Sequence, residues 1–413
     1  MKRVVFGLVL ACLLAATPWA AGSASASKAG AAQPKCAKPT GVYTDAVPWA
    51  QRLVEADRVW PLTTGVGQTV AVVGTGVDSA NAQFAPDQVR GTLDLLGGGS
   101  SDEKTGGSGG GSDCDGRGTF AAGIVAAQPD PSTTFTGMAP GARVLPVRYT
   151  QATSSSSAGG GDPNELAKAI GHAVSNKASV ILVVVPSEVD SPALRSAVER
   201  ATSSGAIVVS PAVATQAGVQ SYPTAIPGVV GVGAVNAAGE PVQSELGDHI
   251  SIAAPGDGLV GTSAGAKGKI GHTWPVKDPS FAASYVAGAI ALLRSYRPDL
   301  NPQQVIDRLT LTASRAASGG HDPQRGWGTL DVYAAVSAEL PPGPPGATVS
   351  VAAPRPAMVV PMPAPAKPVD RGWVAGLVVV FGVLTAIATW AIGAAIRRGR
   401  ERHWRPGHSP PRA

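Results

Sequence analysis

The chain has 413 residues, of which 44% are hydrophobic and only 15% are charged, enough apolar material for one large core. The formal net charge of +5 lies at the two ends, because residues 1–26 carry two basic residues and residues 397–413 carry six arginines against one glutamate. Ser27–Ile396 has 25 basic and 27 acidic residues, so its charge excludes a strongly basic nucleic-acid-binding surface.

The first 26 residues have the three parts of a secretory signal peptide. Lys2 and Arg3 precede the apolar run Val4–Ala16, and small residues follow up to Ala26. This order predicts export, with cleavage near Ala26. The alternative is an N-terminal membrane anchor, but the apolar run is too short to span a bilayer comfortably.

An N-terminal arm (27–47), a globular domain (48–340) and a Pro-rich stalk (341–372) are expected to follow the signal. The next segment, Trp373–Ile396, has 24 residues without a charge and is long enough for a transmembrane helix. Arginines dominate the tail after it, 397–413, which predicts a cytoplasmic tail and a main domain outside the inner membrane. A buried core helix is the alternative, but such a helix rarely carries a basic tail.

Apolar strands and helical stretches alternate through the globular domain. Strands are expected at Thr69–Val77, Ala142–Tyr149, Ser179–Pro186, Ala206–Val213, Val229–Val235 and Ile250–Gly256. Between several of them, apolar residues recur at helical spacing. The pattern predicts an α/β fold with a mostly parallel sheet and helices on both faces. Phe281–Pro298 is expected to be a long buried helix, and Asn301 is expected to cap the next helix.

Three cysteines are present, and Cys12 leaves with the signal. Cys36 and Cys114 then remain in an oxidising compartment, which predicts a disulfide between them, with two free buried thiols as the alternative. No group of histidine, cysteine and acidic residues has the spacing of metal ligands, so neither a metal nor another cofactor is expected.

Four sequence blocks between Pro48 and Ala338 carry a family resemblance: VAVVGTGV, DGRGT, SPAVAT and DPSFAASYVAG. In chain order they resemble the aspartate, histidine, oxyanion-hole and serine blocks of the subtilisin-like serine proteases. With the N-terminal arm and the C-terminal apolar segment, the chain resembles the mycosins of type VII secretion systems. The resemblance implies a subtilisin-like fold and a protein that binds subunits of a secretion membrane complex, in several copies.

Three of the four functional positions of that family are replaced. Gly74 occupies the aspartate position, Arg117 the histidine position and Ala214 the oxyanion asparagine position, whereas Ser280 is retained. A guanidinium stays protonated and has no lone pair, so Arg117 cannot be the general base. Whether Arg117 forms a salt bridge or holds a partner's carboxylate stays open. Asp78 is expected to be a loop or cap residue rather than a replacement acid.

The favoured hypothesis is therefore a membrane-anchored pseudoprotease, with Ser280 serving only to cap the helix after it. The alternative is a weakly active serine endopeptidase that uses Ser280 with His272, although a solvated loop histidine is the favoured interpretation of His272. A third hypothesis is that the former cleft binds extended peptides without cutting them.

Overall fold

The computed structural model describes residues 36–96, 113–151, 161–216, 218–243, 245–315, 319–340, 385 and 387–399. The chain divides into two units after Pro345. The predicted signal peptide and stalk lie outside the described residues.

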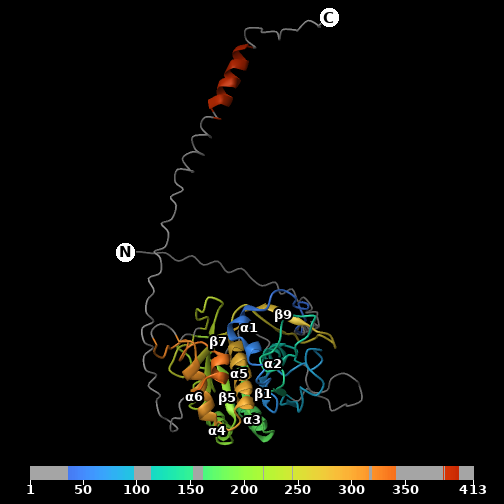
Figure 1. Ribbon diagram of the computed structural model, residues 1–413, viewed down its shortest axis with the longest axis vertical. Coiled ribbons are helices and arrows are strands. Elements are labelled where there is room, and N and C mark those ends of the chain that lie inside the picture. Colours follow the sequence, from blue (N-terminus) through green and yellow to red (C-terminus); the bar gives the residue numbers. More distant parts are fainter. Residues whose placement is uncertain are drawn as a thin grey trace, which may run out of the picture. The chain divides into compact units, whose positions relative to one another are not determined.

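A seven-stranded parallel sheet forms the centre of the first unit, with the strand order β2-β3-β1-β4-β5-β6-β7 (Figure 1). The strands are β1 (Thr69–Gly74), β2 (Leu93–Asp94), β3 (Arg143–Arg148), β4 (Val180–Val183), β5 (Ile207–Pro211), β6 (Val230–Val235) and β7 (Ile250–Pro255). All six strands expected from the sequence are present, and the predicted mostly parallel sheet is confirmed. Of the seven strands in this sheet, only β2 was not predicted, because two residues are too few to show a periodicity.

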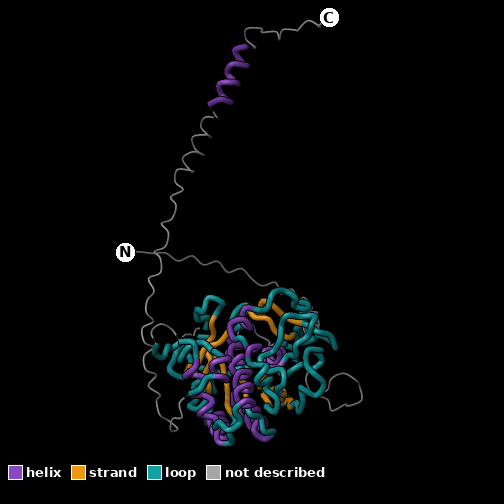
Figure 2. Tube along the Cα trace, in the orientation of Figure 1, coloured by secondary structure: helices purple, strands orange, loops and turns teal. Residues whose placement is uncertain are grey.

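Helices cover both faces of this sheet, as predicted (Figure 2). On β1, Val70 and Val72 belong to one hydrophobic cluster, while Ala71 and Val73 belong to another, because successive side chains of a strand point to opposite faces. The first cluster contains α2 (Arg117–Ala126) and α5 (Ala282–Tyr296), and the second contains α3 (Pro163–Ser175) and α4 (Pro192–Ser203). The long buried helix predicted from the sequence is α5, whose residues from Ala282 to Leu293 are all buried.

The remaining helices are short or lie at the edge of the body: α1 (Trp49–Val54), α6 (Pro302–Thr312) and α7 (Val332–Ser337). Asn301 caps α6 as predicted, since its side chain accepts a hydrogen bond from the backbone N–H of Gln304 and the Gln304 side chain accepts one from the N–H of Asn301. This reciprocal capping satisfies two backbone donors that the helix leaves unpaired.

A two-stranded antiparallel sheet of β8 (Leu259–Thr262) and β9 (His272–Val276) leads into α5. The N-terminal arm lies along β9, because the His272 N–H donates to the carbonyl of Gly41 at 2.7 Å and the Thr40 N–H donates to the carbonyl of His272 at 2.8 Å. The expectation of a loop around His272 is therefore wrong.

The predicted disulfide between Cys36 and Cys114 is present, with the two Cα atoms 4.4 Å apart. It fixes the start of the described arm to the residue three positions before α2. The Ala37 N–H also donates to the carbonyl of Cys114 at 2.8 Å. Arm and helix start are thus held by both a covalent bond and a hydrogen bond.

In the second unit, residues 387–399 and residue 385 are helical, and Ile387, Trp390, Ile392 and Ile396 are exposed there. Most of the predicted span, Trp373–Ile396, lies outside the described residues. Within the part of the chain that the structure describes, no helix combines the length and apolarity needed to cross a membrane.

Candidate functional site

The retained and replaced positions lie where the sheet meets the helices. Gly74 is the last residue of β1, Arg117 is the first of α2, and Ser280 lies in a short 3-10 helix, η2 (Pro279–Phe281), that runs into α5. Arg117 and Ser280 are in contact, with 3.3 Å between Nη1 and Oγ. Ala214 is buried in the segment after β5. The structure thus brings together two of the four positions that the sequence blocks indicated, Arg117 and Ser280.

The end of β1 has little room for an acidic side chain. A Cβ atom at Gly74 would lie 3.2 Å from the Cβ of Val184, which is closer than ordinary van der Waals contact. Asp78 does not replace the lost acid, because its two carboxylate oxygens accept hydrogen bonds from the N–H groups of Ala80 and Gly265, at 2.9 and 2.7 Å. Asp78 is thus a loop residue, as expected.

Asp113 holds the start of α2 in place. Its Oδ1 accepts a hydrogen bond from the N–H of Gly116 at 2.8 Å, and its Oδ2 accepts one from the N–H of Thr119 at 2.7 Å. Gly116 has a φ of 89°, which a glycine adopts without strain, and this turn places Arg117 at the first helical position. The first turn of α2 is thereby fixed, and so is the direction in which Arg117 leaves it.

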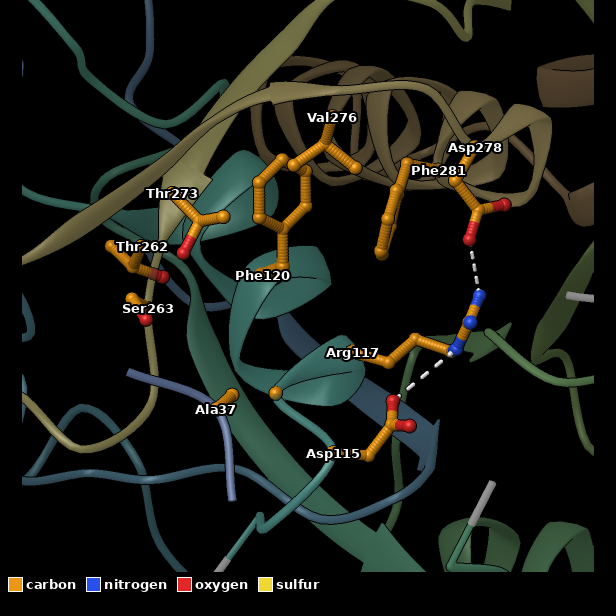
Figure 3. A pocket seen from close by; sticks show the side chains of 11 residues that line it. Ala37, Asp115, Arg117, Phe120, Thr262, Ser263, Thr273, Val276, Asp278 and Phe281 are labelled. Carbon is orange, nitrogen blue, oxygen red and sulfur yellow. Dashed lines mark hydrogen bonds and ion pairs between the residues drawn. The ribbon is translucent and has the colours of Figure 1, made fainter. Parts of the chain in front are cut away.

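The Arg117 side chain forms a salt bridge within the site, which answers the question left open by the sequence. Its side chain is only 9% exposed, and Nη1 donates to Oδ2 of Asp278. On its other side, Nε lies 3.4 Å from Oδ1 of Asp115. Figure 3 shows the guanidinium between the two carboxylates. The position that holds the base in an active subtilisin-like protease is here an ion-pair centre.

Asp278 also binds the retained serine. Its Oδ1 accepts hydrogen bonds from the Ser280 N–H at 2.9 Å and from the Ser280 Oγ at 2.7 Å. Asp278, not Ser280, is the cap residue of the helical turn, so the prediction that Ser280 caps α5 is wrong. The reason is that Pro279 occupies the first position of the turn, where no N–H is needed, and the Asp278 carboxylate reaches the next N–H.

The Ser280 hydroxyl is enclosed by these contacts. It donates to Asp278, accepts from Arg117, and the residue is 0% exposed. A serine nucleophile must approach a carbonyl carbon after losing its proton to a base. Within the described residues, the hydrogen-bond partners of the hydroxyl are Asp278 and Arg117, neither of which carries an imidazole.

Burial raises the pKa values of two acids just before α2, Asp115 and Asp113. Desolvation raises the pKa of Asp115 to about 6, and the charge of Arg117 offsets this only in part. Desolvation also raises the pKa of Asp113, against the hydrogen bonds it accepts from Thr119, Thr75 and Gly116. Burial therefore disfavours the charged form of both Asp115 and Asp113.

His272 serves the arm rather than Ser280. It is 0% exposed; Nδ1 accepts a hydrogen bond from the N–H of Tyr43 at 3.0 Å, and Nε2 lies 2.7 Å from Oε1 of Gln83. An amide oxygen can only accept, so Nε2 carries the proton and the ring is neutral. Burial lowers the pKa of His272 to about 4. The interpretation of His272 as a solvated loop residue is therefore wrong, and both of its nitrogens are engaged away from Ser280.

A cavity of about 280 Å³ adjoins Arg117, between the start of α2, the β8–β9 sheet and the arm. Asp115 and Asp278, which line it, were not recognised from the sequence as functional residues. For Asp278 there was one signal in the sequence: an acid stands two residues before Ser280, where the family block has a glycine. The contacts of Asp115 and Asp278 with Arg117 depend on the folded chain, so the sequence does not show them.

The fold and these blocks agree with a match of residues 65–328 to the subtilase family. The chain belongs to the subtilase family, as a mycosin-type member. Mycosin-1 of Mycolicibacterium smegmatis is 31% identical over an alignment of 472 residues that covers 97% of this chain and 100% of that protein. Mycosin-4 of Mycobacterium tuberculosis is 32% identical, covering 82% of this chain and 80% of its own.

Solved structures of mycosins have the same fold. The crystal structure of MycP1 from the ESX-1 type VII secretion system superposes with a TM-score of 0.63 at 30% identity, covering 76% of this chain and 91% of that one. A chain of an intact ESX-5 inner membrane complex superposes with a TM-score of 0.63 at 27% identity, covering 87% of this chain and 94% of that one.

Replacing Arg117 with methionine should lower the free energy of unfolding by about 3–5 kcal/mol, because Asp278 would be left buried without its counter-charge. Denaturant unfolding at neutral pH measures this. The double variant Arg117→Met, Asp278→Asn should recover part of the loss, since it removes the uncompensated charge. A single variant as stable as the wild type would show that the ion pair does not hold the site together.

Acidification should destabilise the arm through His272. Its folded pKa of about 4 lies below the ordinary 6.5, so the unfolded chain binds the proton more tightly, and stability falls as the pH drops from 6.5 towards 4. The contribution is about 3 kcal/mol between pH 7 and pH 4. The stability difference between the wild type and His272→Gln should therefore shift by this amount over that range. A stability difference that is the same at pH 7 and at pH 4 would contradict this role of His272.

Proposed function

We propose that this mycosin-type subtilase is a pseudoprotease that acts as a structural component of a type VII secretion membrane complex. The observation that supports inactivity most directly is the buried Ser280 hydroxyl, hydrogen-bonded to both Asp278 and Arg117. The predicted signal peptide and transmembrane segment complete the proposal: a single-pass protein whose folded body lies outside the inner membrane.

The lost groups correspond to separate parts of the reaction. Arg117 cannot accept the serine proton, Gly74 cannot orient an imidazole, and the methyl group of Ala214 cannot donate a hydrogen bond to an oxyanion. In subtilisin, loss of the serine or the histidine lowers turnover by about 10⁶, and loss of the oxyanion asparagine lowers it by about 10²–10³. These losses of turnover overlap and cannot be multiplied. With all of these groups replaced, substrate binding is the part of the reaction that remains.

A role in assembly agrees with what the chain retains. The body has the complete sheet and its helices, and the related chains in solved structures include one in an ESX-5 inner membrane complex. Another related chain is described as an essential component of the ESX-1 secretion system. A body that has the fold of the family without its catalytic groups is suited to binding subunits of such a complex, including further copies of this chain.

The full-length chain should not react with a fluorophosphonate probe and should not cleave casein or unstructured peptides above the rate of a Ser280→Ala control. The reason is that the hydroxyl is neither activated nor exposed. Gel fluorescence and mass spectrometry of the protein measure labelling by the probe, and the release of peptides measures cleavage. Labelling that depends on Ser280 would instead support the weakly active endopeptidase.

In the native host, the tagged chain should co-purify with membrane subunits of the secretion system, and Ser280→Ala should retain that co-purification and the level of secretion. Arg117→Met, which should destabilise the body, should reduce both. Quantitative mass spectrometry of the purified membrane fraction is the measurement. Secretion lost in Ser280→Ala at an unchanged protein level would contradict the structural role.

A further inference from the structure

The cavity beside Arg117 has an unbalanced set of charges. Nη1 of Arg117 is bonded to Asp278 and Ser280, while its Nε has no hydrogen-bond partner and lies 3.4 Å from Asp115. One guanidinium thus faces two carboxylates, so one negative charge remains in excess when both carboxylates are ionised. With two carboxylates and one guanidinium lining it, the cavity favours a cation over an anion.

The other walls of the cavity suit a long amphipathic side chain. The rings of Phe120 and Phe281 and the side chain of Val276 form an apolar part, and Thr262 and Thr273 lie opposite Arg117 (Figure 3). A volume of about 280 Å³ has room for an aliphatic stem with a charged head. Lysine and arginine side chains place such a stem on apolar surface and keep the head at polar groups.

Asp115 can meet such a head from outside the protein. Its side chain is 14% exposed, whereas those of Arg117 and Asp278 are 9% exposed. Among the described residues, no three histidine, cysteine or acidic side chains gather closely enough to hold a metal ion. The chemistry therefore favours an organic cation, whose stem uses the apolar wall, over a bare metal.

We propose that this cavity binds a basic side chain of an extended polypeptide, with Asp115 as the acceptor of its positive charge. The inference rests on the proposed function, because a bound peptide persists only where Ser280 does not cut it. It adds the class of ligand: a polypeptide segment with a lysine or arginine, held but not processed.

The test uses the full-length chain in detergent and three fluorescent peptides, which are alanine-rich and identical except for one central residue. That residue is lysine, norleucine or glutamate, and binding is followed by fluorescence polarisation at neutral pH. The lysine peptide should bind about tenfold more tightly than the norleucine peptide, as expected for one charge-assisted contact, and the glutamate peptide should bind most weakly. Asp115→Asn should remove most of the preference for lysine.

Asp87→Asn is the matched control, because Asp87 is exposed, pairs with Arg90 and does not line the cavity. It should leave the lysine preference unchanged. Asp115→Asn should fold normally, since burial disfavours the charged form of Asp115, and its thermal unfolding temperature at neutral pH checks this.

Each result separates this inference from the proposed function. Equal binding of the lysine and norleucine peptides, without cleavage, overturns the basic-side-chain site and leaves the pseudoprotease standing. A lysine preference that survives Asp115→Asn overturns the role of Asp115. Cleavage of any of the peptides overturns the pseudoprotease, on which the inference depends.

Discussion

The ion pair between Arg117 and Asp278 is the constraint on which the rest of the site depends. Both side chains are about nine-tenths buried, and such charges are stable inside a protein only when they are paired and hydrogen-bonded. Once arginine occupies the first position of α2, an acid is required within reach of it, and Asp278 supplies that acid. The same carboxylate binds Ser280, so the change that removes the base also immobilises the nucleophile.

The hydrogen bonds of this site differ from those of an active catalytic triad. In an active triad the hydrogen bonds are arranged so that a proton can move from the hydroxyl to the imidazole. Here the bonds join α2 to the turn before α5, and the groups that meet the Ser280 hydroxyl are a carboxylate and a guanidinium. The disulfide and His272 strengthen the same region, since both hold the arm against the elements that carry the site.

The strands and the long helix could be predicted because their signals are local. The apolar run of each strand and the helical spacing in Phe281–Pro298 lie within the segments themselves. Gly74 and Arg117 were also readable, because the flanking blocks fix their alignment with the family. The prediction that the base and the orienting acid are replaced therefore rests on the sequence blocks alone.

The roles of His272, Ser280 and Asp115 could not be read in this way. His272 is part of β9 because of pairing with β8 and with the arm at Gly41, far away in the chain. The bond from Arg117 to Asp278 joins residues 161 positions apart, and its consequence for Ser280 depends on how the two meet. Contacts between distant segments decide these roles, and composition and spacing carry no signal for them.

The bridge between Cys36 and Cys114 also determines what proteolysis of this protein can release. A peptide bond broken anywhere between these two residues leaves both fragments on the same molecule. Nicking of the intervening chain by another enzyme would thus leave the two fragments joined in a sizing measurement under oxidising conditions. The fragments can separate only after the disulfide is reduced.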